Sequence, residues 1–221
     1  MKTHFILLSF IVFYSVLYFQ VKAQPLPSEI NLSEQSPDSF LISFETTKGN
    51  FKMKAHRVWS PLACDRLNLL VKNGFYNGCV IYRVAPTLSF KGGFIVQFGL
   101  ANDESVNRSW EKVPVKDEPV VHPHSIGAVS FASGGPKTRS TELAIALTPC
   151  LELDTATYLG AKGFPTVAIV VEGMEVINSF NKQYGNDIFK YPDSLYLGRK
   201  YFDREFPGLD RIISATITKL W

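Results

Sequence analysis

The stretch FLISFETTKGNFKMKA, residues 40–55, decides the fold class of this chain. Residues 40–47 are rich in the aromatic and β-branched side chains that favour strands, and residues 51–55 alternate between apolar and polar side chains. Lys48-Gly49-Asn50, between them, is a turn sequence. The stretch therefore predicts a β-hairpin at the start of a folded domain.

Downstream of this hairpin, short apolar segments separated by glycine and proline predict further strands, at residues 80–84, 94–98, 128–132, 143–147, 167–171 and 212–218. One helix is expected after Ser60-Pro61, with Ser60 as its N-cap, and it should end at Gly74 in a left-handed conformation. A second helix is expected over residues 172–181. Many short strands and two isolated helices favour an antiparallel barrel with capped ends over repeated βαβ units. Residues 183–210 form an aromatic-rich loop that either packs on the barrel or remains mobile.

Upstream of the hairpin, residues 1–23 predict a cleaved signal peptide. A short basic start precedes 15 mostly apolar residues, 5–19, and Val21-Lys22-Ala23 fits a cleavage site. The alternative is an uncleaved anchor, but a bilayer span takes ~20 apolar residues. We therefore expect a secreted protein or one of the secretory-pathway lumen, with no stable membrane insertion after cleavage. Residues 24–38 should be a flexible lead-in, and residues 39–221 one domain.

Composition argues against several kinds of chemistry. After residue 23 the chain has 21 basic and 20 acidic residues, which does not favour nucleic acid as a partner. Three histidines remain, His56, His122 and His124, and none lies in a setting typical of a catalytic triad or a zinc site. Cys64, Cys79 and Cys150 match no metal or redox spacing, so we expect three buried thiols. The sequence therefore predicts no metal and no cofactor.

Four motifs occur in a defined order along the chain. They are YRV at residues 82–84, GFIVQFG at residues 93–99, GAVSFASGGP at residues 127–136 and VEGMEV at residues 171–176. In this order they resemble the cyclophilin family of peptidyl-prolyl cis-trans isomerases, over roughly residues 40–218. The resemblance implies a fold dominated by β-structure, a closed eight-stranded antiparallel β-barrel capped by two α-helices. It also implies an enzyme that isomerises X–Pro bonds.

The resemblance assigns roles to individual residues. Rotation about the peptide bond has a barrier of ~20 kcal/mol and breaks no bond, so a fixed donor beside an apolar slot can lower it. Arg83 is implied as the donor to the prolyl amide, Phe94 as the floor under the proline ring and Gln97 as a support of the substrate backbone. The implied substrate-binding residues are Ile95, Phe131, Ala132, Ser133, Gly134, Glu142, Ala144, Tyr158 and Phe164.

Several positions depart from the family pattern. Ala144 stands where the family commonly has a phenylalanine and removes one wall of the proline pocket. Glu142 places a carboxylate near Arg83, where it either diverts the guanidinium from the substrate or orients it. Phe164 occupies the usual place of a histidine. Tyr158, our candidate for the family's loop aromatic, follows an apparent insertion at residues 149–157, and a second insertion is expected at residues 87–92.

Two functions remain open at this point. The first is a peptidyl-prolyl isomerase acting on secretory-pathway or extracellular proteins, with reduced or altered activity. The second is a catalytically weak or inactive cyclophilin-like module that binds peptides or serves as a scaffold. In both, the partner is a proline-containing peptide or an unfolded protein, and we expect a monomer. The deciding feature is whether Arg83 points into an open groove beside Phe94 or is held by Glu142.

Overall fold

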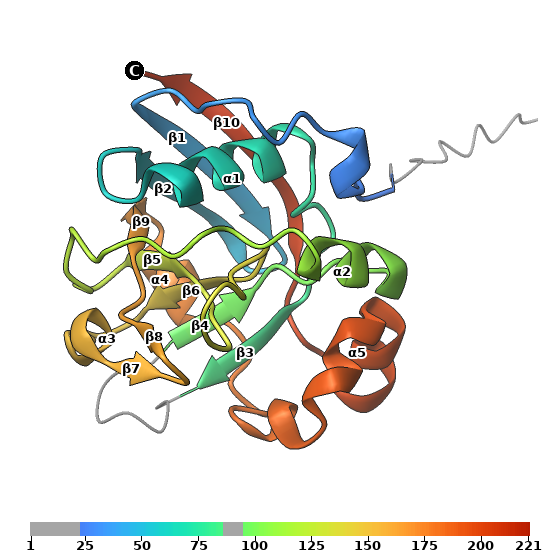
Figure 1. Ribbon diagram of the computed structural model, residues 1–221. Helices are drawn as coiled ribbons and strands as arrows, with labels where there is room; N and C mark the ends of the chain where they lie inside the picture. The colour runs from blue at the N-terminus through green and yellow to red at the C-terminus, as the bar shows by residue number, and fades with distance from the viewer. Residues whose placement is uncertain (1–22, 86–94) are drawn as a thin grey trace, which may run out of the picture.

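One antiparallel sheet of eight strands forms most of the molecule, in the order β10-β1-β2-β9-β5-β6-β4-β3 (Figure 1). This computed structural model describes residues 23–85 and 95–221. The strands are β1 (Ser39–Thr46), β2 (Gly49–His56), β3 (Ile81–Ala85), β4 (Ile95–Phe98), β5 (Ala128–Phe131), β6 (Leu143–Ala146), β9 (Thr166–Glu172) and β10 (Ile212–Leu220). The hairpin predicted over residues 40–55 is confirmed as β1 and β2. A separate short hairpin consists of β7 (Thr157–Tyr158) and β8 (Ala161–Lys162).

The sheet is curled but open, so the expected closed barrel is wrong in that respect. The edge strands β10 and β3 meet only at one end, where the Ile81 amide donates to the Asp210 carbonyl and the Gly78 amide to the Ile212 carbonyl, both at 2.8 Å. β3 is five residues long, and its pairing with β4 shifts at Tyr82. A bulge of this kind bends a strand and interrupts its hydrogen-bond ladder. This explains why β3 diverges from β10 beyond that end.

The first predicted helix is confirmed as α1 (Pro61–Lys72), which packs over β2, β9 and β10. Four of its apolar residues, at helical spacing, lie in the main core: Ala63, Leu67, Leu70 and Val71 are all buried. Gly74 follows with φ +72°, as a left-handed ending requires. The N-terminus differs from expectation, because the carboxylate of Glu118, not Ser60, accepts from the amides of Leu62 and Ala63 at 2.7 and 3.1 Å.

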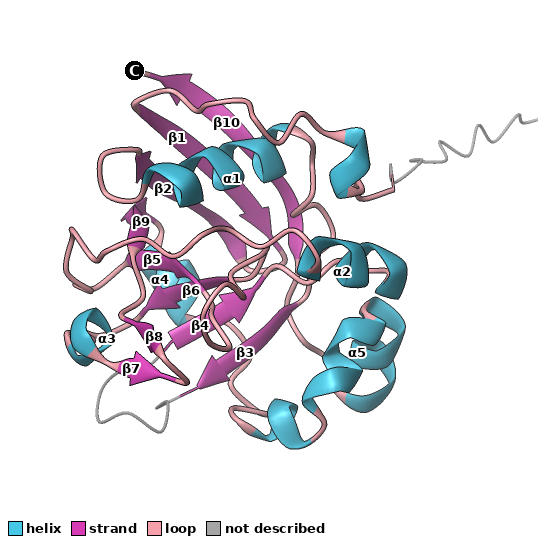
Figure 2. Ribbon diagram, viewed as in Figure 1, coloured by secondary structure: helices cyan, strands magenta, loops and turns pink. Residues whose placement is uncertain are grey.

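The structure has more helices than the two that the sequence predicts. The second predicted helix is short, α4 (Met174–Asn178). The others are α2 (Glu104–Glu111), α3 (Glu152–Thr155) and α5 (Arg199–Glu205), with 3-10 turns η1 (Pro27–Glu29), η2 (Asp187–Lys190) and η3 (Pro192–Leu197) (Figure 2). Within the described ranges, no helix has the length and apolar character that a membrane crossing requires. All three cysteines are buried thiols.

The C-terminal segment, residues 183–206, packs on the outer face of β3, beside α2 (Figure 1). Ile188 is fully buried there, and the Phe202 ring stacks on the Tyr82 ring at 5.6 Å between centroids. Of the two alternatives left open for residues 183–210, packing on the sheet is the one that the structure shows. The prediction of a loop is wrong, because η2, η3 and α5 lie within this segment. This packing brings the segment to the edge of the sheet that carries Arg83.

Residues 24–38 were expected to be a flexible lead-in, but specific hydrogen bonds join their first residues to the domain. The Gln24 side chain accepts from the Asn102 amide at 2.6 Å, and Trp110 Nε1 donates to the Pro25 carbonyl at 2.9 Å. Gln24 is only 9% exposed. Buried polar groups with partners of this kind hold a backbone in place, so this part of the segment is an ordered extension of the domain.

Candidate active site

A row of side chains crosses four strands on the outer face of the sheet. Arg83 on β3 lies opposite Gln97 on β4, Gln97 lies opposite Ala144 on β6, and Ala144 lies opposite Ser130 on β5. Residues directly opposite one another on antiparallel strands point to the same face. The alternate row, Val84, Val96, Ile145 and Val129, belongs to the main core. We call Arg83, Gln97, Ala144 and Ser130 the outer row.

The bulge in β3 brings two successive residues to this face. Ile81 belongs to the main core, whereas Tyr82 packs with the C-terminal segment and Arg83 faces Gln97. In a regular strand Tyr82 and Arg83 would point to opposite faces. Because the pairing shifts between Ile81 and Arg83, both the phenol and the guanidinium reach the same site.

The Arg83 guanidinium is held on three sides. Its Nη1 donates to Gln97 Oε1 at 3.0 Å, and its Nε and Nη2 donate to Asn186 Oδ1 at 3.1 and 2.6 Å. The Phe189 ring lies against its face, 4.7 Å from Cζ to the centroid. Arg83 is 6% exposed, and burial lowers its pKa, although an arginine remains charged at any physiological pH.

Glu142 contacts the outer row through Gln97. Its carboxylate accepts from the Tyr82 hydroxyl and from Gln97 Nε2, the latter at 3.2 Å. Gln97 thus bridges Glu142 to Arg83, donating to one and accepting from the other. Burial raises the pKa of the Glu142 carboxyl. The carboxylate therefore acts on Arg83 through the orientation of Gln97, which favours the orienting role over the diverting one.

The apolar part of the predicted site lies along the same face. Ile95 is nearly buried opposite Ala146, and Ala144, half-buried, occupies the middle of the outer row. Phe164, also half-buried, packs on the cluster that contains Ala146. Phe94, the predicted floor, lies outside the described residues, as does the predicted insertion at residues 87–92.

Four of the predicted substrate-binding residues, 131–134, lie at the end of β5 and directly after it. Phe131 is fully buried in the main core, so its side chain does not reach the outer face. Ala132 and Ser133 are half-buried and Gly134 is exposed. The Ser133 hydroxyl donates to the Gly135 carbonyl at 2.7 Å, which shapes the turn. Of this stretch, the structure therefore leaves residues 132–134 as the part available to a peptide.

Tyr158 lies on β7, in the short hairpin that follows the predicted insertion at residues 149–157. At the tip of this hairpin Leu159 approaches Gly135, and Gly160 approaches Pro136. Tyr158 itself is half-buried. The structure thus places this candidate beside the loop after β5 and not on the outer row.

A hydrogen-bonded chain that sequence reasoning missed ends at Ser130. His124 Nδ1 lies 2.7 Å from Asp154 Oδ1, and His124 Nε2 lies 3.2 Å from Ser130 Oγ. Burial lowers the pKa of His124, so the neutral ring is favoured. We assign the proton to Nδ1, where the carboxylate accepts it, so that Nε2 accepts from the Ser130 hydroxyl.

The hydrogen bonds connect a carboxylate, a histidine and a serine as in a catalytic triad, but these side chains are buried and inaccessible to a substrate. His124 is 1% exposed and Ser130 3%. A nucleophile must be reachable by the group it attacks. The hydrogen bonds from Asp154 through His124 to Ser130 therefore link the α3 segment to β5 as a structural contact. No sequence motif could have revealed it, because Asp154 is 30 residues from His124 and only the fold brings them together.

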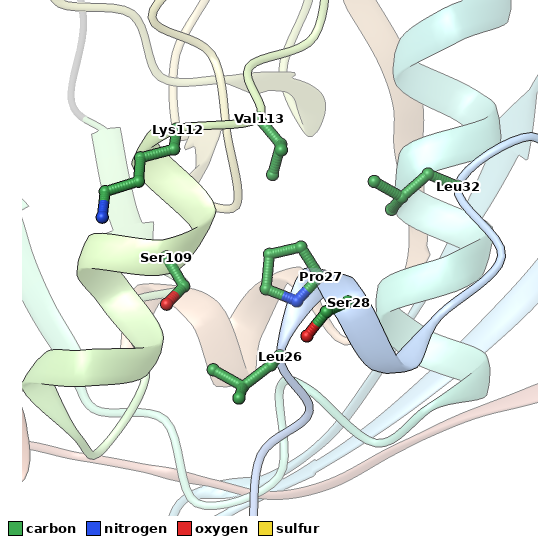
Figure 3. Close-up of a pocket in the computed structure, with 7 residues that line it drawn as sticks. All are labelled: Leu26, Pro27, Ser28, Leu32, Ser109, Lys112 and Val113. Carbon is green, nitrogen blue, oxygen red and sulfur yellow. The ribbon is translucent and has the colours of Figure 1, made fainter.

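A pocket of about 360 Å³ lies elsewhere, between the lead-in and the end of α2 (Figure 3). It is lined by Leu26, Pro27, Ser28, Leu32, Ser109, Lys112 and Val113. None of these residues belongs to the outer row. Lys112 is the one charged side chain in this lining.

Comparison with known families matches residues 41–194 to the family described as cyclophilin type peptidyl-prolyl cis-trans isomerase. The chain belongs to the cyclophilin-type isomerases. Membership confirms both the family resemblance and the enzyme class that the sequence predicts.

Two curated proteins illustrate the distance within the family. Peptidyl-prolyl cis-trans isomerase-like 1 of Gibberella zeae is 25% identical over 113 residues, covering 51% of this chain and 68% of that one. Peptidyl-prolyl cis-trans isomerase 10 of Caenorhabditis elegans is 28% identical over 153 residues, covering 64% and 85%. A solved cyclophilin-type isomerase of Cryptosporidium parvum has a similar fold, with a TM-score of 0.56, 17% identity and coverage of 82% of this chain and 98% of that one.

Proposed function

We propose that this cyclophilin isomerises X–Pro bonds of secretory-pathway or extracellular proteins, at a rate lowered by its altered pocket. The observation that carries the proposal is the placement of Arg83. Its guanidinium lies on the outer face next to Gln97, and the three hydrogen bonds described above end on neutral amide oxygens. Its positive charge is therefore available to a substrate.

The proposed mechanism needs no nucleophile. As the X–Pro bond twists, the prolyl nitrogen loses conjugation with its carbonyl and becomes a better hydrogen-bond acceptor. An N–H of Arg83 donates to that nitrogen and stabilises the twisted state more than the planar one. The guanidinium has five N–H donors, and the three bonds to Gln97 and Asn186 use three of them. Two donors are then left for the substrate.

Two features support a lowered rate. Ala144 provides only a methyl group at the middle of the outer row, so the proline ring loses an aromatic contact worth ~0.5–1.5 kcal/mol. Arg83 is also only 6% exposed and is in contact with Asn186 and Phe189, which limits the access of a substrate to its guanidinium.

The proposed location rests on the N-terminal sequence. The apolar run at residues 5–19 and the small residue Ala23 fit a signal peptide, and Gln24, the next residue, is hydrogen-bonded to the domain. A mature chain starting at Gln24 would keep all of these contacts. Mass spectrometry of the exported protein tests this, since a first residue well inside the domain or an intact N-terminus would contradict it.

The test of the catalytic proposal is acceleration of cis/trans exchange in a short X–Pro peptide, with Arg83→Ala as the comparison. A hydrogen bond to a charged group is worth ~1.5–3 kcal/mol, so the variant should be slower by about 10-fold to 100-fold. Circular dichroism verifies that the variant is folded. Equal rates for the two proteins would refute the proposed role of Arg83.

A second candidate, a peptide-binding module with little catalysis, is favoured by the near burial of Arg83. It predicts that a proline-containing peptide binds the wild type and Arg83→Ala with similar affinity, and that neither protein accelerates exchange. Titration calorimetry with the same peptide, beside the exchange assay, separates the two candidates.

A further inference from the structure

We propose that Asn186 of the C-terminal segment is a positioning residue for catalysis, one that holds the Arg83 guanidinium in its working orientation. The inference rests on the proposed isomerase function and adds to it a residue that lies 103 positions from Arg83 in the chain. Neither the motifs in the sequence nor the strand register points to this residue. Only the packing of the C-terminal segment on β3 brings it to the site.

The geometry of the contact suits this role. A single oxygen, Asn186 Oδ1, accepts from both Nε and Nη2, which form one edge of the planar guanidinium. Gln97 Oε1 accepts from Nη1, and the Phe189 ring supports the face of the group. Two hydrogen-bonded sides and one stacked face determine the position and the plane of the group. A donor fixed in this way loses little entropy when the transition state forms.

The chemistry of the acceptor matters as much as its position. Asn186 is a neutral amide, so it orients the guanidinium without compensating its charge. A carboxylate at this place would form an ion pair and weaken the donation to substrate. The Glu142 carboxylate hydrogen-bonds to Gln97 and Tyr82.

The backbone around Asn186 is anchored firmly enough to serve as a support. Asn186 is exposed, but Ile188, two residues on, is fully buried against the outer face of β3. The Phe189 amide donates to the Asn186 carbonyl at 3.0 Å, and the Asp187 amide to the Tyr184 carbonyl at 2.9 Å. Because Asn186 itself is exposed, its substitution should leave the fold intact.

The test is the kinetics of Asn186→Ala in the exchange assay, with Gln183→Ala as a matched control. Gln183 is an exposed amide on the same segment, so its removal changes the surface equally without touching Arg83. We expect kcat to fall about tenfold in Asn186→Ala with KM changed by less than about twofold, and no change in the control. An unchanged or higher kcat in Asn186→Ala would overturn the proposal, because the segment would then be neutral or an obstruction.

Two further measurements separate positioning from a general structural role. In an Arg83→Ala background, Asn186→Ala should cause no further loss, because it acts through the missing guanidinium. A full additional loss would contradict this. In NMR spectra the Arg83 Nε–H resonance should lose its protection from exchange in Asn186→Ala but not in Gln183→Ala. This signal needs no activity, so it tests the contact even if the wild type proves no faster than Arg83→Ala.

Discussion

The two ends of the outer row are both nearly buried, yet they differ in the hydrogen-bonding capacity left to them. Arg83 is 6% exposed and Ser130 is 3% exposed. The three bonds at Arg83 use three of its five N–H donors and end on neutral oxygens, whereas the single O–H of Ser130 is directed at His124. Burial alone therefore does not distinguish the proposed catalytic group, Arg83, from the structural one, Ser130. The two residues differ in the number of N–H or O–H donors that have no acceptor among the residues that the structure describes.

The first prediction tests the structural end of the row and has the largest expected effect. Asp154→Ala leaves two donors of nearly buried His124, Nδ1–H and the backbone amide, without their acceptor. An unsatisfied buried donor costs ~1–3 kcal/mol, so the free energy of unfolding should fall by about 2–3 kcal/mol in urea denaturation. Glu152→Ala, an exposed carboxylate on the same helix, is the control. If Asp154→Ala were as stable as the wild type, the hydrogen bonds of Asp154 with His124 would not support the fold.

The second prediction concerns the centre of the row, between the two ends. Ala144→Phe adds the ring that the family commonly has at this place, so kcat/KM for the X–Pro peptide should rise. An aromatic contact of ~0.5–1.5 kcal/mol corresponds to roughly 2-fold to 10-fold. Ala144→Leu, which adds bulk without a ring, should gain less. A folded Ala144→Phe protein with unchanged kcat/KM would mean that the proline ring does not lie over this residue.

The third prediction concerns Glu142, which joins the Arg83 end to Tyr82, and has the smallest expected effect. Burial raises the pKa of its carboxyl, so the folded state binds this proton more tightly than the unfolded state does. The contribution of this group to stability is therefore greatest below the ordinary carboxyl pKa of 4.5 and falls as the pH rises through the raised value. Glu142→Gln removes that fall. The difference in unfolding free energy between wild type and variant, measured across this range, should change with pH; a constant difference would contradict the assignment.

The predictable parts of this protein are those written in short, local patterns. The hairpin of residues 40–55, the α1 helix and the left-handed Gly74 all follow from strand propensity, capping and turn chemistry, and all are confirmed. The ordered motifs around Arg83 and Gln97 led to the family, and the strand register places these two side chains together.

The features that local patterns did not predict depend on distant partners. α1 takes its cap from Glu118, and the open edge of the sheet follows from the bulge at Tyr82. The polar partners of Ser130 and Arg83, His124 with Asp154 and Asn186, lie on separate segments. The local sequence pattern around a side chain does not reveal a hydrogen-bond partner on a distant segment.

The amino-acid sequence by itself determined the β-rich class, the α1 helix and the family, and through the family it singled out Arg83 as the proposed donor. Strand propensity, helical periodicity and a fixed motif are properties of neighbouring residues. The tertiary structure alone decided how the Arg83 guanidinium is held, which of its N–H groups are bonded to Gln97 and Asn186, and that Ser130 on the same row is buried against His124. The physical reason is that each of these depends on burial and on acceptors brought from elsewhere in the chain, and folding decides both at once.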